Sequence, residues 1–269
     1  MGLATVLGLA PRGFFIPYRY AASLPEAKAY PALAARFDAY RDGFAAVLDA
    51  IDGYADAFRA IGDAPPPAPR WDQDWFPPLD AATAYAIVRR HAPRRIVEVG
   101  SGHSTRFLMR ALADGGIGAG VLAIDPAPRA DIATLPMTSF PGTVQAAGAD
   151  CFAGLVANDI LFIDSSHILM PGSDVDVVLN DVLPTLAPGV LVHFHDIFLP
   201  DAYPREWRWR GYNEQLGVAP LVTSGAYEPI FASRYVATRM AERLQRSVVA
   251  PLPRIDGAVD SSLWLRKLR

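Results

Sequence analysis

At residues 95–105 the chain reads RIVEVGSGHST, and this segment is the strongest indication of the fold. Residues 95–99 have the apolar, β-branched character of a buried strand. Gly100 and Gly102 then allow a tight turn, and Ser104 opens a helix behind it. A strand, a glycine-rich turn and a helix in this order are typical of the ligand-binding edge of a parallel α/β sheet.

The rest of the chain repeats this alternation of short apolar runs and helical patterns, which predicts parallel strands joined by crossover helices. Further strands are expected at 121–124, 144–146, 160–163, 190–194, 228–233 and 262–266. Helices are expected at 80–91, with Asp80 as the N-cap, and at 104–113, 151–157, 174–186 and 235–244. We therefore predict a Rossmann-like α/β fold with a doubly wound, mostly parallel sheet of about seven strands.

The N-terminal part has a different pattern. Residues 31–61 carry a heptad repeat, made of Phe37, Phe44, Ile51 and Phe58 with Tyr40, Val47, Tyr54 and Ile61 three residues after each. The repeat predicts one long helix, and a stiff proline-rich connector follows at 64–69. Such a stripe either packs on its own domain or forms a homodimer with a second copy, and the sequence leaves both open. We divide the chain into an N-terminal helical extension with its connector, 1–70, and a Rossmann-like domain, 71–269.

The composition favours small-molecule chemistry in a reducing compartment. A formal net charge of -3 over 269 residues gives no electrostatic reason to expect nucleic acid as a partner. Cys151 is the single cysteine, so no internal disulfide can form. The apolar run at the N-terminus is too short to span a bilayer. We expect a cytoplasmic protein without a membrane partner.

The glycine-rich turn by itself has more than one interpretation. Asp125 follows the second predicted strand, where its carboxylate can accept hydrogen bonds from the hydroxyls of a ribose. A nicotinamide site would use the same two features. Two details argue against it: Thr105 stands where the third glycine of that fingerprint belongs, and Glu98 would place a carboxylate beside the pyrophosphate.

Four motifs at the ends of successive predicted strands carry a family resemblance. They lie at residues 97–102, 122–125, 162–167 and 193–197. Together they resemble class I S-adenosylmethionine-dependent methyltransferases, and among these a bacterial small-molecule branch related to sugar and antibiotic O-methyltransferases. The resemblance runs from about Trp71 to the C-terminus, and it implies the seven-stranded sheet of that class.

The resemblance also implies cofactor contacts. Glu98, Gly100, Ser101 and Gly102 would surround the methionine end of S-adenosylmethionine, Ser104 its carboxylate, Asp125 its ribose and Asp150 its adenine. Asp150 has an alternative interpretation as the N-cap of the next helix.

At the reacting end, Asp164 follows the fourth predicted strand, and His195 and Asp196 follow the fifth. The resemblance to the metal-assisted relatives, catechol O-methyltransferase among them, implies a divalent metal on Asp164, His195 and Asp196. His195 departs from the acid–amide pair of those relatives, so the metal could be magnesium or a softer ion, and metal use stays open. Without a metal, His167 or His195 would act as the base beside Asp164, because imidazole titrates near neutral pH.

We therefore expect methyl transfer to an oxygen of a small hydroxylated acceptor, with nitrogen acceptors still open. The aromatic loop at 198–212, with Trp207, Trp209 and Arg210, is either a lid over the acceptor or ordinary packing. Two alternatives remain: an oxidoreductase or metal-dependent hydroxylase on the same fold, and a non-catalytic cofactor-binding module that acts through a partner.

Overall fold

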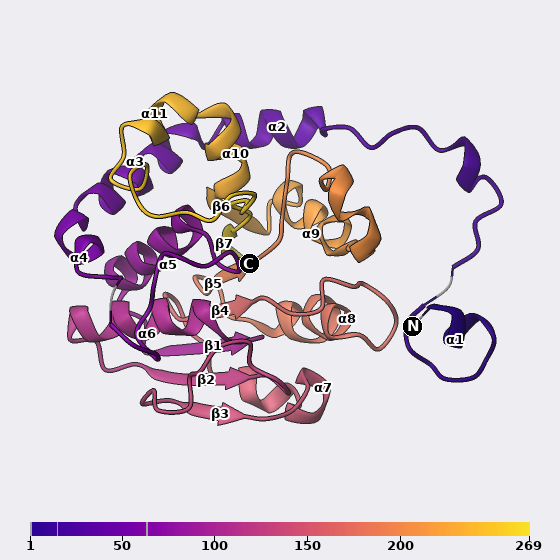
Figure 1. Ribbon diagram of the computed structural model, residues 1–269, viewed down its shortest axis with the longest axis horizontal. Coiled ribbons are helices and arrows are strands. Elements are labelled where there is room, and N and C mark those ends of the chain that lie inside the picture. Colours follow the sequence, from indigo (N-terminus) through magenta and orange to yellow (C-terminus); the bar gives the residue numbers. More distant parts are fainter. Residues whose placement is uncertain (1, 15, 63) are drawn as a thin grey trace.

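The computed structural model describes residues 2–14, 16–62 and 64–269. Within this part of the chain, one sheet of seven strands has the order β3-β2-β1-β4-β5-β7-β6 (Figure 1). All pairs are parallel except those that β7 makes with β5 and β6. The predicted fold, a mostly parallel doubly wound sheet of about seven strands, is therefore confirmed. The strands are β1 Arg95–Val99, β2 Gly120–Ile124, β3 Thr138–Phe140, β4 Ile160–Ile163, β5 Leu191–Phe194, β6 Tyr227–Ala232 and β7 Leu263–Lys267.

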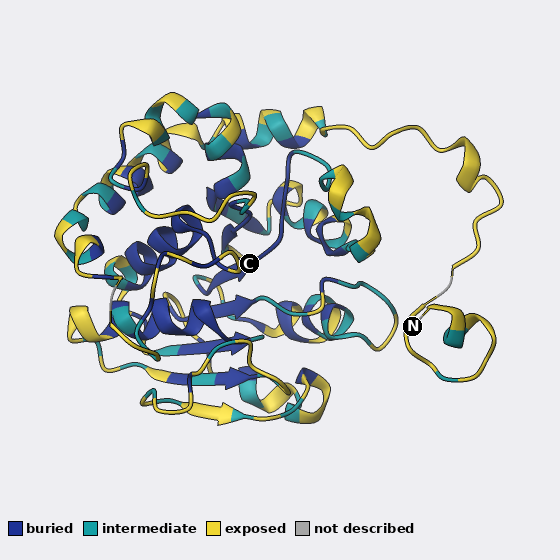
Figure 2. Ribbon diagram, viewed as in Figure 1, coloured by how far each residue is buried: buried dark blue, intermediate teal, exposed yellow. Residues whose placement is uncertain are grey.

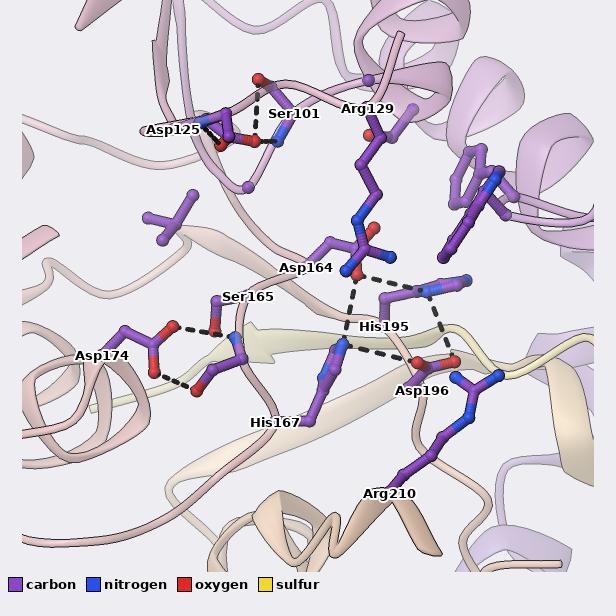
Figure 3. A pocket seen from close by; sticks show the side chains of 18 of the residues that line it. Ser101, Asp125, Arg129, Asp164, Ser165, His167, Asp174, His195, Asp196 and Arg210 are labelled. Carbon is purple, nitrogen blue, oxygen red and sulfur yellow. Dashed lines mark hydrogen bonds and ion pairs between the residues drawn. The ribbon is translucent and has the colours of Figure 1, made fainter. Parts of the chain in front are cut away.

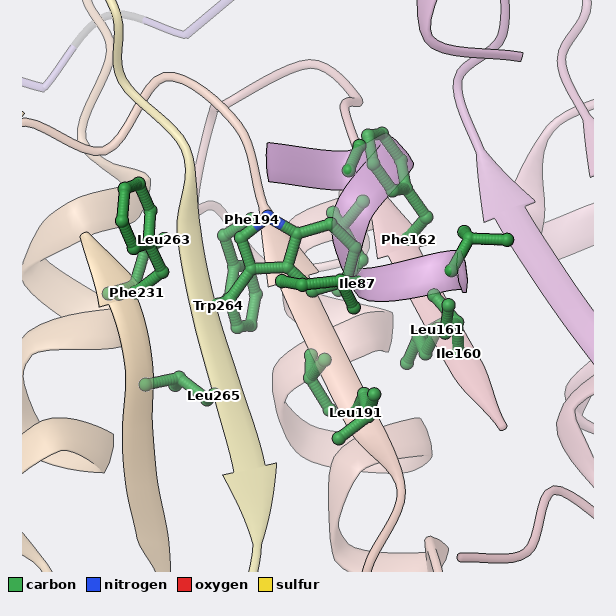
Figure 4. Close-up of a cluster of buried hydrophobic side chains, with 14 of the residues drawn as sticks. Ile87, Ile160, Leu161, Phe162, Leu191, Phe194, Phe231, Leu263, Trp264 and Leu265 are labelled. Atoms are coloured by element: carbon green, nitrogen blue, oxygen red, sulfur yellow. The ribbon is translucent and has the colours of Figure 1, made fainter. Parts of the chain in front are cut away.

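The most apolar strands occupy the centre of this sheet. All residues of β4 and β5 are buried, and their side chains pack against those of β7 and of the helices that cover the sheet (Figures 2 and 4). The edge strand β3 is largely exposed. This gradient follows from the sequence, since continuous apolar runs can only be strands covered on both faces.

Helices flank the sheet and also build the N-terminal part. They are α1 Gly2–Val6, α2 Pro31–Asp38, α3 Arg41–Asp52, α4 Ala55–Arg59, α5 Pro78–His91, α6 His103–Gly115, α7 Val144–Ala147, α8 Asp174–Val177, α9 Glu214–Thr223, α10 Ser233–Arg239 and α11 Ala241–Gln245. A π-helical segment, Val178–Val182, and a 3-10 turn, Leu183–Thr185, continue α8 to nearly the predicted end at residue 186.

Three local predictions were wrong. Residues 144–146 form helix α7 instead of a strand, because the Thr143 hydroxyl accepts a hydrogen bond from the amide of Ala146 and caps a helical turn. The predicted helix at 151–157 is only a short 3-10 turn, Ala149–Phe152. Asp80 is not an N-cap, since Pro77 holds that position.

The predicted long helix at 31–61 is divided into α2, α3 and α4 by turns near Tyr40 and Tyr54. The breaks keep the seven-residue register, and Phe37, Phe44, Ile51 and Phe58 are all buried in the core that also covers the sheet. Phe44, for example, packs on Phe231 of β6 with ring centroids 5.9 Å apart. The heptad stripe therefore packs on its own chain, and a homodimer through this region would have to use other residues.

Residues 2–14 and 16–29 leave this compact body as an arm (Figure 1). Many of the exposed large apolar side chains belong to it, for example Leu3, Leu9 and Phe14. No helix in the described residues has both the length and the apolar character needed to cross a membrane.

The topology decides where a site can form. Strands β1, β2, β4 and β5 are parallel, so their carboxyl ends and the loops after them meet at one edge of the sheet. The four sequence motifs end there.

Candidate active site

A cavity of about 860 Å³ opens at this edge of the sheet. Its floor is the glycine-rich turn between β1 and α6, where Gly100 has a φ of 79°. A Cβ atom on Gly100 would stand 1.7 Å from the carbonyl oxygen of Asp164. Any side chain at position 100 would clash with the end of β4. Glycine therefore allows the turn after β1 to pack directly against the end of β4, and residues from both strands line the same cavity.

Most of the residues predicted to bind the cofactor line this cavity: Gly100, Ser101, Gly102, Ser104 and Asp125. The Asp125 carboxylate accepts hydrogen bonds from the Ser101 amide at 2.6 Å and from the Ala127 amide at 2.7 Å (Figure 3). These bonds fix the carboxylate at the end of β2. Asp150 is exposed, in the short turn Ala149–Phe152, and it is not among the residues that line the cavity.

Glu98 lies beneath the cavity and has no exposed surface. Its two oxygens accept hydrogen bonds from the hydroxyls of Ser104, at 2.7 Å, and Thr105, at 2.6 Å. Burial raises the pKa of Glu98 to about 8 even though both hydrogen bonds lower it. Glu98 therefore holds the first turn of α6 in place, and it reaches the cavity through Ser104.

Four polar side chains converge at the other end of the cavity: Asp164, His167, His195 and Asp196 (Figure 3). Nε2 of His167 lies 3.4 Å from Oδ1 of Asp164 and 3.4 Å from Oδ2 of Asp196. Nδ1 of His195 faces the same two carboxylates at 3.5 and 3.6 Å. The ends of β4 and β5 thus bring together all the residues that the sequence assigned to catalysis or to a metal.

The other nitrogen of each imidazole meets a buried carboxylate that sequence reasoning did not assign to the site. Nδ1 of His167 lies 2.8 Å from Oε2 of Glu214, the first residue of α9. Nε2 of His195 lies 3.3 Å from Oδ2 of Asp80, in the first turn of α5. Both carboxylates are far from their histidines in sequence, so no local pattern could have connected them.

These ion pairs control the charges of the cluster. Burial alone would lower the pKa of His167, but the carboxylates of Asp164 and Glu214 raise it well above its usual range. Asp164 and Asp196 raise the pKa of His195 in the same way. The charge of His195 in turn holds the pKa of Asp164 far below its ordinary value, despite the opposing effect of burial. The positive charges of the two imidazolium rings thus offset the negative charges of the carboxylates around them.

The same geometry tests the metal expected from the sequence. In residues 2–14, 16–62 and 64–269, no three His, Cys, Asp or Glu side chains are arranged to hold a metal ion. Asp164, His195 and Asp196 lie close together, but the two carboxylates flank the imidazoles of His167 and His195. The metal on Asp164, His195 and Asp196 stays a prediction from the sequence.

Aromatic side chains and two arginines form the outer wall of the cavity. Trp207 and Arg210 come from the loop at 198–212, and the Arg210 guanidinium lies 3.9 Å from the centre of the Trp207 ring. Across the cavity mouth, Arg129 lies 4.3 Å from the ring centre of Trp75. Trp209 is exposed and does not belong to the lining. Two of the three residues named for the predicted lid, Trp207 and Arg210, therefore line the cavity.

Three buried polar atoms of the lining have no hydrogen-bond partner within the described residues: His103 Nδ1, Ser165 Oγ and Arg210 Nε. Burial lowers the pKa of His103 to about 4, with a further effect of Arg106, so its ring is neutral at pH 7. Unpaired buried polar atoms are costly, and a polar ligand in the cavity would satisfy them. His193 differs: it lies outside the lining, fully buried, stacked on Phe162 and hydrogen-bonded to Ser262 at 2.9 Å.

Comparison with known proteins gives a family match for the part of the chain that builds this site. Residues 97–197 match the family model of a methyltransferase domain. No curated protein matches the chain. One similar solved structure is an O-methyltransferase from Bacillus cereus in complex with SAH, at 14% identity and a TM-score of 0.44, over 83% of this chain and 91% of that one. A second is an SAH-bound methyltransferase from Podospora anserina, also at 14% identity and a TM-score of 0.44, over 96% and 100% of the two chains. A third is the MycE methyltransferase of mycinamycin biosynthesis in complex with Mg, SAH and mycinamycin VI, at 14% identity and a TM-score of 0.40, over 81% and 54%.

The matched residues run from β1 to the end of β5 and include the glycine-rich turn, Asp125, Asp164 and the His195–Asp196 pair. The sheet around them has the seven-stranded, mostly parallel form that the sequence resemblance implies. Residues 97–197 are therefore similar to a methyltransferase domain, and the sheet that contains them has the form expected from the sequence.

Proposed function

We propose that this protein transfers the methyl group of S-adenosylmethionine to an oxygen of a small hydroxylated acceptor. One observation carries the proposal. His167 presents Nε2 to the cavity that also contains the glycine-rich turn and Asp125, while its Nδ1 is held by Glu214. The carboxylates around His167 favour its protonated form, so it takes a proton from a hydroxyl group only after it has lost its own proton at Nε2.

The cofactor lies, in this proposal, along the ends of β1 and β2. Gly100, Ser101 and Gly102 admit its methionine end, with Ser104 at the carboxylate, and Asp125 accepts hydrogen bonds from the ribose. Glu98 supports this end indirectly, because its oxygens are already occupied by Ser104 and Thr105. Asp150 is exposed, so an adenine contact would require its turn to approach the cavity.

When bound, S-adenosylmethionine supplies a methyl group on a positively charged sulfonium, and that charge lowers the pKa of nearby imidazolium groups. Neutral His167 accepts the proton of the acceptor hydroxyl at Nε2. The acceptor oxygen forms the new bond to the methyl carbon, and the carbon–sulfur bond breaks with its electron pair remaining on sulfur. The protonated His167 is stabilised by Glu214 and Asp164, and it later returns the proton to solvent.

His195 and Asp196 complete the charge balance around the acceptor. His195, between Asp80 and the two cavity carboxylates, offsets the negative charge of Asp164 and Asp196. Positioning and charge then provide the rate enhancement. No step of the proposed reaction runs through a metal.

The acceptor is bounded by an aromatic and cationic wall. Trp207 and Arg210 face the reacting end from one loop, and Trp75 and Arg129 from the other side of the cavity. Flat side chains of this kind suit a ring-shaped acceptor, either an aromatic ring or a sugar.

A methyl-transfer assay tests the proposal. The protein is incubated with trideuteromethyl-labelled S-adenosylmethionine and a panel of catechols, phenols, hydroxylated sugars and amines, and products are identified by mass spectrometry, with EDTA and with added magnesium. We expect labelled O-methyl product under both conditions. His167→Asn should reduce kcat by about 10²-fold or more, whereas His91→Asn, outside this cavity, should leave it unchanged.

Three results would contradict parts of this account. No labelled product from any acceptor would overturn the proposed reaction. Products labelled only on nitrogen would overturn the choice of oxygen. Activity that EDTA abolishes and magnesium restores would replace the metal-free assignment with the metal site predicted from the sequence.

A further inference from the structure

Arg210 brings a positive charge to the cavity without a matching acid. It is the last residue of the 3-10 turn Arg205–Arg210, in the loop between β5 and α9, and it lines the cavity. Within the described residues its guanidinium forms no ion pair. Its Nε atom is buried and has no hydrogen-bond partner there either. A partly buried cation without partners is costly, and an anion in the cavity would offset that cost.

Aromatic rings hold this guanidinium in place. It lies 3.9 Å from the ring centre of Trp207 and 5.5 Å from that of Tyr212. Trp207 packs in turn on the buried ring of Phe198, with ring centroids 4.9 Å apart. Such contacts use the face of the guanidinium and leave the N–H groups at its edge free. Arg210 is therefore fixed by its neighbours, and its N–H groups remain available to a ligand.

The position of Arg210 is at the reacting end of the cavity. Tyr212, which the guanidinium contacts, also packs on the ring of His167, with centroids 4.6 Å apart. Figure 3 shows Arg210 pointing from its loop toward the part of the cavity that contains Asp196. Asp196 is already paired with His167, at 3.4 Å, and with His195, at 3.6 Å. An anion bound by Arg210 would thus lie beside the acceptor hydroxyl of the proposed reaction.

Arg129, the other arginine of the lining, has a different environment. Its amide donates to the carbonyl of Ser101 at 3.4 Å, and its Cβ would lie 3.8 Å from a Cβ on Gly102. Its backbone therefore packs on the glycine-rich turn, at the proposed cofactor end. Arg129 is also exposed, so water can solvate its charge without a ligand. Arg210 is the lining arginine that comes from the acceptor side.

We propose that the acceptor carries an acidic group, a carboxylate or a phosphate, and that Arg210 binds this group through paired hydrogen bonds. The inference rests on the proposed function, since it names the class of acceptor for that reaction. A guanidinium presents its N–H groups in a fork that matches two oxygens of either acid. A neutral sugar or phenol would leave the fork unpaired, so it should be a poorer acceptor.

The test compares acids with uncharged analogues of the same shape. The pairs are protocatechuate with its methyl ester, glucuronate with glucose, and inositol monophosphate with inositol. In at least one pair, the kcat/KM of the wild type should be at least about tenfold higher for the acid. Arg210→Gln should reduce this ratio to about one, and Arg210→Lys should give an intermediate ratio because it keeps the charge without the fork. Arg208→Gln is the matched control, in the same turn but exposed and outside the lining, and it should keep the wild-type ratio.

A binding measurement gives the same answer without turnover. Isothermal titration of the protein loaded with S-adenosylhomocysteine gives the Kd of the three acids. Arg210→Gln should raise the Kd of the preferred acid at least about tenfold, and it should change the Kd of S-adenosylhomocysteine less than about twofold. Preference for protocatechuate or glucuronate identifies a carboxylate, and preference for inositol monophosphate identifies a phosphate.

Three results would overturn the inference. The first is that no acid binds, or that no acid is preferred to its neutral partner in any pair. The second is a preference that Arg210→Gln leaves intact. The third is an equal loss of S-adenosylhomocysteine affinity in Arg210→Gln, since Arg210 would then serve the cofactor. If Arg210→Gln lowers the midpoint of thermal unfolding, Arg210→Lys decides by the same criteria.

Failure of this inference differs from failure of the proposed function. Methylation of neutral acceptors as fast as of their acids would overturn the acidic acceptor and leave the methyl transfer in place. Acids that bind through Arg210, in a wild type that methylates no acceptor, would overturn the methyl transfer and support the acid site.

Discussion

Glu98 belongs to the motif that was recognised in the sequence, but its complete burial was not predicted. The motif places a carboxylate before the glycine-rich turn, and the structure buries it under Ser104 and Thr105. With its pKa raised to about 8, Glu98 is largely protonated at pH 7. Its neutral form then resembles a glutamine in shape and in hydrogen bonding.

This predicts a pH-dependent cost to stability. Between the ordinary pKa of 4.5 and about 8 the folded chain keeps a proton that the unfolded chain releases, so the free energy of unfolding falls as pH rises. Glu98→Gln should remove that contribution, at most about 1.4 kcal/mol per pH unit. Denaturant unfolding at pH 5, 6.5 and 8 measures the slope, with Glu228→Gln as the control. Equal slopes in Glu98→Gln and the wild type would mean that Glu98 is ionised.

The sequence was sufficient to find the cavity residues that directly follow strands. Asp125, Asp164, His167, His195 and Asp196 could be placed together, because parallel strands end at one edge of the sheet. Glu214 and Asp80 could not, since they depend on how α9 and α5 pack, 47 and 115 residues away from their histidines. No periodicity or motif marks either residue.

Among the secondary-structure elements, the glycine-rich turn after β1 is the segment that packs directly against the end of β4. The sequence predicted β1 and the turn well, because a buried run followed by glycines has few alternative structures. It failed at residues 138–146, where β3 is short and exposed and lacks an apolar pattern. The strand was instead predicted at the more apolar residues 144–146, which form a helix capped by Thr143.

The close approach of this turn to β4 gives a test at Gly100. Gly100→Ala would place its Cβ 1.7 Å from the Asp164 carbonyl oxygen, so β4 or the turn must move. We expect a loss of about 3 kcal/mol or more in the free energy of unfolding, and at least about tenfold weaker binding of S-adenosylhomocysteine. Gly116→Ala is the control, because its φ is also positive, at 60°, but its Cβ would meet open space. Equal effects of the two substitutions would contradict the packing of this turn against β4.

For the whole molecule, the N-terminal helices belong to the same hydrophobic core as the sheet. The heptad repeat was recognised in the sequence, but its partner could not be, since an apolar stripe fits its own domain or a second copy equally well. The structure buries it against α5, β6 and α10: Phe58 packs on Tyr85 of α5, and Phe44 packs on Phe231 of β6 and on Tyr235 of α10. In the arm that precedes these helices, no residue of 2–14 or 16–29 is buried.

Phe44→Ala therefore should destabilise the entire protein. Removing this buried ring should cost about 3–5 kcal/mol in the free energy of unfolding. Phe14→Ala, in the exposed arm, should cost less than about 0.5 kcal/mol. Two separate unfolding transitions, with only one of them shifted by Phe44→Ala, would show instead that residues 31–61 fold independently of the sheet.

The central claim is that the cavity at the ends of β1, β2, β4 and β5 binds S-adenosylmethionine. Isothermal titration of the protein with S-adenosylhomocysteine and, separately, with NADH, each with and without magnesium, tests it most directly. We expect micromolar binding of S-adenosylhomocysteine alone, independent of magnesium and weakened by Asp125→Ala. Binding of NADH with none of S-adenosylhomocysteine under either condition would contradict it and favour an oxidoreductase on the same fold.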